Sequence, residues 1–220
     1  MLYLILALGL VGSTPASAVP VQDEPLHRVV YAGKTLRVLD VVIPPHGSTL
    51  YHAHVNDMVG VTLAPGPTRD EKAGAAPVDE PPDKPGEVWL AVHPQRDVHR
   101  VTNLGDSEIH MVAVELLSSE RVTNTARRGA IPGGVVQLEN SKTRIVRYSL
   151  RPGQTIKLHS HGSYVLVALG PGRIGGVCGG SESHLVSRAG YLCVAAQEGQ
   201  HQISNVGANP IELLEFEIGQ

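Results

Sequence analysis

Residues 50–57 read Leu-Tyr-His-Ala-His-Val-Asn-Asp, and a similar order, Leu-His-Ser-His-Gly-Ser-Tyr, returns at residues 158–164. Side chains two positions apart in a β-strand point to the same face, so His52 and His54 share one face of the predicted strand. The two histidines of the second stretch are related in the same way. Two imidazoles in this arrangement can bind one metal ion. The sequence is therefore organised around two His-x-His strands.

A third histidine follows each pair and is followed by a similar tail. The first tail reads His-Arg-Val-Thr-Asn at residues 99–103, and the second reads His-Gln-Ile-Ser-Asn at residues 201–205. A sheet that folds back on itself would bring this third histidine opposite the pair. The sequence thus predicts two metal-binding trios: His52, His54 and His99 in the first half, and His159, His161 and His201 in the second.

The repeat extends well beyond the histidines. A shift of 107 positions superposes Arg37 on Arg144, and a shift of 102 superposes Asn103 on Asn205. The shift becomes smaller because residues 67–86 hold an insertion rich in proline and charge, which predicts a surface loop. β-Branched runs recur in both halves, and no convincing helix longer than two or three turns is visible. Such a duplication predicts an all-β protein built from two similar units.

The first 18 residues predict a secretory signal peptide. They contain no charged side chain, are apolar from Leu2 to Val11 and close with Ala16-Ser17-Ala18, the small-x-small pattern that signal peptidases cut. A buried first strand or a membrane anchor is the alternative, but the apolar run is shorter than the roughly 20 residues that span a bilayer. We therefore expect a secreted or periplasmic protein with no membrane span in its mature chain.

The signal and the repeat together predict the domain boundaries. The roughly 200 residues after the signal suffice for one sizeable β domain or two small ones with real cores. The predicted organisation is a signal peptide at 1–18, an N-terminal domain at 19–117, a linker at 118–134 and a C-terminal domain at 135–220.

Charge and cysteine content restrict the partners and the redox chemistry. The net charge is −3, with both signs interspersed, so the chain has no basic footprint for nucleic acid and no polybasic membrane patch. The two cysteines, Cys178 and Cys193, lie in the second half. Export would allow a disulfide between them to persist, and two buried thiols are the alternative.

These motifs resemble those of the cupin superfamily, and the double copy resembles a bicupin. The family's first motif combines glycines with His-x-His and a glutamate, and its second combines glycines, a proline, a histidine and an asparagine. The matching positions outside the trios are Gly153, Gly172, Gly190 and Asn205 in the second half, and Pro94 and Asn103 in the first. The resemblance implies two tandem jelly-roll or double-stranded β-barrel domains with the histidines inside.

The chain departs from the family at the glutamate. Where the family places it, the second half has Val165 and the first half has Met58 or Val59. Asp57 and Tyr164 stand one position earlier, and strand alternation would turn them to the other face unless a bulge intervenes. Each half is therefore expected to offer three histidines without a carboxylate.

Three imidazoles on rigid strands suit a divalent transition metal and leave coordination positions open for water or substrate. We expect one such ion per site, with iron, zinc, manganese, copper and nickel as the candidates. Satisfied barrel histidines without metal are the alternative. The predicted substrate-binding residues near the sites are Asp57, His93, Arg96 and Tyr164.

Two functions agree with this pattern. The first is an exported metal-dependent enzyme, an oxygenase or related oxidoreductase, that acts on a small molecule. The second is a non-catalytic cupin that binds a small ligand such as a sugar or an acid, and a purely structural role is a third reading. The fold does not choose between them, because cupins host many activities. Exposed sheet edges also allow a homodimer.

Overall fold

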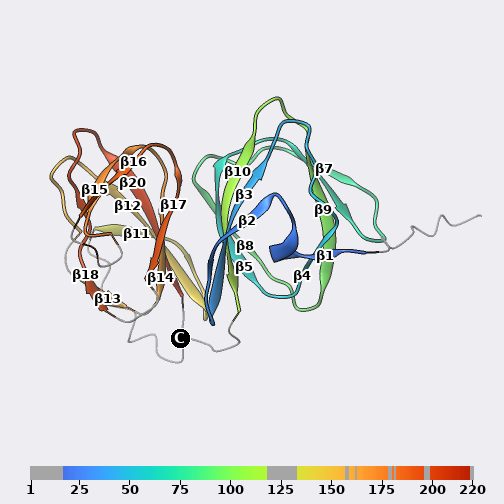
Figure 1. Ribbon diagram of the computed structural model, residues 1–220, viewed down its shortest axis with the longest axis horizontal. Helices are drawn as coiled ribbons and strands as arrows, with labels where there is room; N and C mark the ends of the chain where they lie inside the picture. Colours follow the sequence, from blue (N-terminus) through green and yellow to red (C-terminus); the bar gives the residue numbers. More distant parts are fainter. Residues whose placement is uncertain are drawn as a thin grey trace, which may run out of the picture.

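The computed structural model describes residues 17–117, 133–156, 159–161, 163–177, 180, 182–195 and 199–218, with only the backbone described at 159–161 and 199–201. Apart from 3-10 structure at η1 (Val21–Asp23) and at Val177, the regular structure of these residues is entirely β. The strands form two halves that lie side by side (Figure 1). The predicted all-β fold is confirmed.

Two five-stranded sheets make up the first half. Their orders are β1-β4-β9-β6-β7 and β2-β3-β10-β5-β8. The strands are β1 (Val19–Pro20), β2 (His27–Ala32), β3 (Leu36–Ile43), β4 (His52–His54), β5 (Met58–Ala64), β6 (Thr68–Lys72), β7 (Val78–Glu80), β8 (Glu87–Ala91), β9 (Asp97–Asn103) and β10 (Ile109–Leu116).

The second half repeats this plan. Its five-stranded sheet, β11-β12-β20-β14-β17, has the same connectivity as β2-β3-β10-β5-β8, and it is joined by the smaller sheets β13-β18 and β16-β15-β19. The strands are β11 (Gly134–Glu139), β12 (Thr143–Leu150), β13 (His159–His161), β14 (Tyr164–Ala168), β15 (Gly172–Gly175), β16 (Ser183–Val186), β17 (Gly190–Ala195), β18 (Gly199–His201), β19 (Ser204–Asn205) and β20 (Ile211–Ile218).

The insertion at residues 67–86 is more ordered than predicted. It contains β6 and β7, and β6 pairs with β9 along its whole length, from Thr68 opposite Asn103 to Lys72 opposite His99. The prediction of a loop was wrong here because the charged residues of β6 find partners on neighbouring strands. Arg69 pairs with Asp79 on β7, for example. The Pro-rich part that follows β7 is exposed, as predicted.

Alternation along β3 separates two cores. Leu36 and Val38 face the second half, whereas Leu39 and Val41 point between the two sheets of the first half. Burial of each such side chain stabilises the fold by about 1.5–3 kcal/mol. The core shared by the halves lies between the sheet β2-β3-β10-β5-β8 and the sheet β11-β12-β20-β14-β17. Its buried side chains are Leu36, Val38, Val59, Val61, Val112, Val114, Leu116, Ile145, Val165, Val167, Leu214, Phe216 and Ile218. The halves are therefore joined by one continuous apolar layer.

A polar cluster lies at one end of this layer. Asp40 accepts hydrogen bonds from His110 Nε2 at 2.6 Å and from Arg28 at 2.5 Å, next to a cavity of about 250 Å³ that residues 185–192 complete. The hydrogen bond from His110, together with Arg28, lowers the pKa of Asp40 to about 2. The carboxylate is thus ionised and satisfied although it is buried.

Parts of the predicted signal, linker and disulfide lie outside the described residues. Residues 1–16 of the predicted signal and residues 118–132 of the predicted linker lie outside the described residues. Cys193 on β17 is not a free thiol, but Cys178 also lies outside them, so the Cys178–Cys193 bridge stays a prediction. No helix in the described part of the chain has the length and apolar character needed to cross a membrane.

Candidate metal centre

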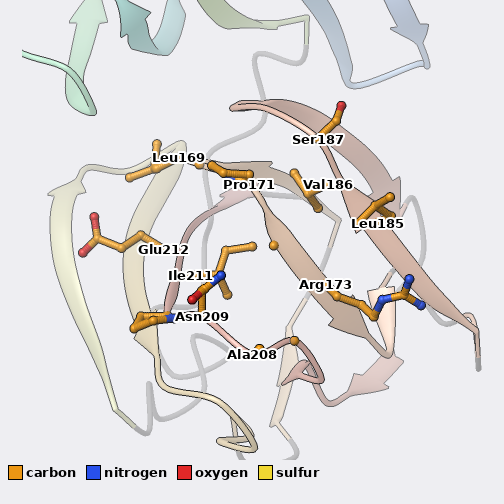
Figure 2. A pocket seen from close by; sticks show the side chains of 14 residues that line it. Leu169, Pro171, Arg173, Leu185, Val186, Ser187, Ala208, Asn209, Ile211 and Glu212 are labelled. Carbon is orange, nitrogen blue, oxygen red and sulfur yellow. The ribbon is translucent and has the colours of Figure 1, made fainter.

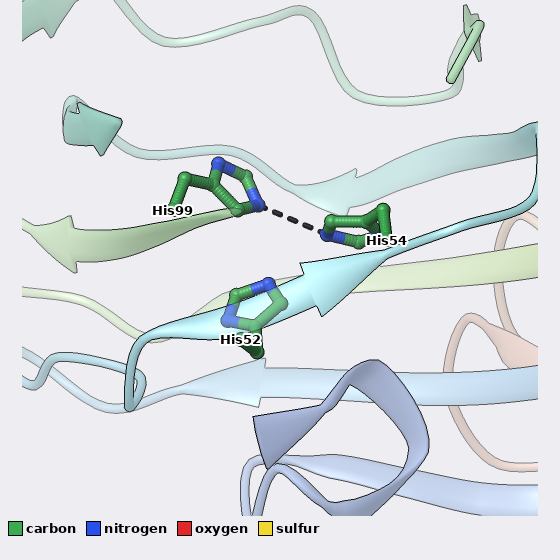
Figure 3. A group of neighbouring side chains, drawn as sticks. All are labelled: His52, His54 and His99. Carbon is green, nitrogen blue, oxygen red and sulfur yellow. Dashed lines mark hydrogen bonds between the residues drawn. The ribbon is translucent and has the colours of Figure 1, made fainter. Parts of the chain in front are cut away.

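Strands β4 and β9 bring the first histidine trio together. His52 lies directly opposite His99 in the antiparallel register, and His54 follows on the same face of β4. One ring nitrogen from each of the three lies within 4.8 Å of the others (Figure 3). His54 Nε2 and His99 Nε2 are 3.0 Å apart. Side chains separated by 45 residues in sequence thus converge on one point.

The outer nitrogens of the three rings are engaged by their surroundings. His52 Nδ1 donates to the carbonyl oxygen of Leu50 at 2.9 Å, and His99 Nδ1 donates to Asp70 Oδ1 at 2.8 Å. We assign these tautomers because a carbonyl and a carboxylate can only accept. His54 Nδ1 lies 3.0 Å from the sulfur of Met58. The Nε2 lone pairs of His52 and His99 are thereby left for the centre of the group.

Burial keeps the imidazoles of His52 and His54 neutral. It lowers the pKa of His52 to about 4 and, with the neighbouring histidines, the pKa of His54 to about 2. Neutral imidazole is the form that binds a metal ion. The hydrogen bond from His99 lowers the pKa of Asp70, so this carboxylate stays ionised at neutral pH.

Two further histidines extend the cluster. The His27 ring meets the His52 ring edge to face, with centroids 4.6 Å apart, and the His93 ring stacks on His54 at 4.8 Å with an interplanar angle of 11°. The sequence predicts His93 near the site. It does not reveal His27, which stands alone at the start of β2 and belongs to no motif. Burial lowers the pKa of His27 to about 3.

Asp70 is the other functional residue that the sequence did not reveal. It lies on β6, within the segment predicted as a surface loop, and it orients His99. A carboxylate that holds the outer nitrogen of a histidine is the usual second partner of a metal ligand. Only the pairing of β6 with β9 brings Asp70 to this position.

Two predicted substrate-binding residues of the first half have other surroundings. Asp57 Oδ1 accepts from the His93 amide at 2.9 Å, and Asp57 Oδ2 accepts from Lys142 Nζ at 2.6 Å. Both oxygens are thus engaged by groups other than the trio. Arg96 is exposed between β8 and β9, and no contact between it and the trio is found among the described residues.

In the second half, the backbone repeats the arrangement of the first trio. His159 lies opposite His201 in the pairing of β13 with β18, as His52 lies opposite His99. His161 continues β13 on the same face. The side chains of this trio lie outside the described residues, so the second site stays a prediction.

Tyr164 does not take the place that strand alternation predicted. It is buried in the core within the second half, whereas Val165 belongs to the core shared between the halves. Tyr164 pairs with Glu217 as Met58 pairs with Glu115, so Tyr164 is the counterpart of Met58 and not of Asp57. The reason is the connection after the His-x-His strand, which is one residue shorter in the second half and reverses the phase of β14.

One cavity belongs to the second half alone. It has a volume of about 780 Å³ and is formed by turns and by parts of β15, β16 and β20, with Leu169, Arg173, Asn209 and Glu212 among its lining residues (Figure 2). None of the six trio histidines lines it. Convergence of ligand atoms, and not cavity size, therefore locates the candidate centre.

Comparison with known proteins supports the fold. No protein-family model matches the chain, and no curated protein matches its sequence. AerE from Microcystis aeruginosa is similar in structure, with a TM-score of 0.57 and 14% identity over 90% of this chain and 99% of that chain. A salicylate 1,2-dioxygenase variant from Pseudoaminobacter salicylatoxidans, in complex with gentisate, has a TM-score of 0.59 and 13% identity over 91% and 76%. An oxalate decarboxylase has a TM-score of 0.55 and 14% identity over 85% and 70%.

The dioxygenase and the decarboxylase are cupin-family proteins. Their likeness covers most of both halves of this chain, and the strand order repeats within it. The protein therefore has the cupin fold in two tandem copies, as the sequence predicted.

Proposed function

We propose that the first half binds one divalent transition metal ion through His52, His54 and His99. The observation that carries this proposal is the convergence of three imidazoles whose outer nitrogens are already engaged. Nitrogen donors of this kind fit iron, zinc, manganese, copper or nickel. With three protein ligands, such an ion would retain open positions where it can polarise a small substrate or activate water or dioxygen.

We propose that the substrate is a small molecule with an apolar part. Leu50, Val55 and Val92 flank the His-x-His strand and His93, and each is more than half exposed. An apolar molecule could cover these side chains and exclude water from the buried rings. His93, half-buried beside His54, offers a polar contact to the same molecule.

We further propose that the protein is a metal-dependent oxygenase acting on such a molecule. The support is the fold shared with a salicylate dioxygenase, one variant of which holds gentisate. Oxygen consumption by metal-loaded protein with salicylate and gentisate would test this directly. Thermal stabilisation by a sugar or an acid, without metal and without turnover, would instead favour the alternative of a non-catalytic binding protein.

Metal binding itself is tested by elemental analysis of wild type and of His52→Ala. We expect the variant to lose the ion while the fold, followed by circular dichroism, is retained. His184→Ala is the matched control, since His184 is exposed on β16. A wild-type protein that takes up none of the five metals would contradict the proposal.

We also propose that the protein is exported and cleaved after Ala18. In support, β1 begins at Val19, whose amide donates to the Tyr51 carbonyl at 3.0 Å, so cleavage would keep this strand. Amino-terminal sequencing of protein from its native compartment should start at Val19. Pairing of sheet edges in a homodimer remains a prediction, which sedimentation analysis would test.

A further inference from the structure

One ion pair links the second half to the surroundings of the first-half trio. Lys142 lies in the turn between β11 and β12, and its Nζ donates to Asp57 Oδ2 at 2.6 Å. The other oxygen of Asp57 accepts from the backbone amide of His93 at 2.9 Å. A single carboxylate thus joins residues separated by 49 positions in sequence and lying in different halves.

The position of His93 matters because its ring lies on a metal-ligand candidate. The ring stacks on His54 with an interplanar angle of 11°. Its backbone amide is held by Asp57, which is also three residues beyond His54 in the loop from β4 to β5. Through this hydrogen bond and the three-residue connection to His54, Asp57 fixes the two stacked histidines relative to each other.

Further hydrogen bonds anchor the two loops that carry Asp57 and Lys142. Asn56, next to Asp57, donates to Glu115 at 2.8 Å, and this anchors the loop within the first half. The Lys142 amide donates to Asn140 Oδ1 at 2.7 Å, which fixes the turn of the second half. The Lys142 and Asp57 side chains are 32% and 17% exposed. A charge-assisted bond in such a half-buried place is stronger than a fully exposed ion pair.

We propose that Lys142 is a positioning residue for the first-half metal centre. It holds Asp57 so that His93 stays stacked on His54, and the second half thereby helps to order the site of the first. This inference rests on the proposed metal-binding function. It gives the second half a role at the centre that does not depend on metal binding by its own histidines.

The test compares three variants of the full chain. Lys142→Met removes the charge and keeps the length of the side chain, and Lys142→Arg restores the charge. Lys34→Met is the matched control, because Lys34 is exposed in the turn between β2 and β3, the first-half counterpart of the turn that holds Lys142. Amide exchange at His93, measured by NMR on metal-free protein, reports the link itself, and the visible absorption spectrum of Co²⁺-loaded protein reports ligand geometry.

We expect Lys142→Met to raise exchange of the His93 amide about tenfold, as the loss of one charge-assisted hydrogen bond would do, and to shift the Co²⁺ spectrum. Lys142→Arg should restore both, and Lys34→Met should change neither. The proposal would be overturned if the His93 amide of Lys142→Met exchanged at the wild-type rate. It would also be overturned if amide exchange rates rose equally throughout β8 and β9. If wild-type protein takes up no Co²⁺, the metal centre itself is refuted, and faster His93 exchange would then describe a structural link only.

Discussion

The two halves share strand order and register but differ in what fills their interiors. His27 pairs with Val41 in the first half, and Gly134 pairs with Tyr148 at the same place in the second. The large ring is therefore on β2 in the first half, as His27, and on β12, the counterpart of β3, in the second half, as Tyr148. A side chain on Gly134 would collide with the Tyr148 ring, since an added Cβ would lie 2.7 Å from it. The same space thus holds an imidazole in one half and a phenol in the other.

The position of Asp70, which orients His99 in the first half, also differs between the halves. Asp70 lies on β6, two residues beyond the partner of Asn103, and the corresponding residue after β15 is Gly176. Gly176 has φ +77°, and an added Cβ would lie 2.0 Å from the carbonyl oxygen of Gln202. A carboxylate therefore cannot be placed there without moving the backbone. Duplication has preserved the histidines in sequence, but the position of Asp70 is a glycine in the second half.

Acid should unfold the protein through the first half. The folded pKa values of His52, His27 and His54, about 4, 3 and 2, lie below their ordinary value of 6.5. Below pH 6.5 the unfolded chain therefore binds protons that the folded chain does not, and stability falls. At pH 5 we expect a loss of about 2 kcal/mol for each of these histidines in metal-free protein. Denaturant unfolding between pH 8 and 4 would measure it, and a flat profile would contradict the burial of the cluster.

Alkali should instead act through the second half. Burial, with nearby Glu215 and Glu217, raises the pKa of Tyr148 above its ordinary value of 10. The unfolded chain then loses a proton that the folded chain keeps, so stability declines as the pH rises above 10. Tyr148→Phe should reduce this decline and leave the loss of stability at acid pH unchanged. An equal alkaline slope in both proteins would show that other groups control it.

Tyr164→Ala should lower the free energy of unfolding by about 3–5 kcal/mol, because a large buried ring is removed from the core. The metal content of the folded protein should stay the same. Urea titration and elemental analysis would check the two statements. Unchanged stability with lost activity would restore Tyr164 as a substrate-binding residue.

Asp70→Ala should weaken metal binding about 10–100-fold, the usual effect of removing the carboxylate behind a histidine ligand. Competition with a chromophoric chelator would measure the affinity. Asp79→Ala is the control, since Asp79 pairs with Arg69 on the exposed β6–β7 hairpin. Equal affinities in the two variants would show that Asp70 does not support the site.

The sequence predicted the parts that follow from local periodicity. The His-x-His spacing, the repeat and the third histidines were enough to predict an all-β tandem fold and to bring His52, His54 and His99 together. It did not reveal His27 or Asp70, because strand pairing across the sheets determines where these side chains lie. A connection shorter by one residue also reversed the facing of Tyr164, and pattern reading alone could not detect that change.

Metal content of a matched pair of variants tests the central claim most directly. His99 and His201 occupy the same register position, opposite the first histidine of each pair. After dialysis against a weak chelator, we predict that His99→Ala has lost the tightly bound ion and that His201→Ala has kept it. Full metal content in His99→Ala, with loss in His201→Ala, would contradict the assignment of the metal centre to the first half.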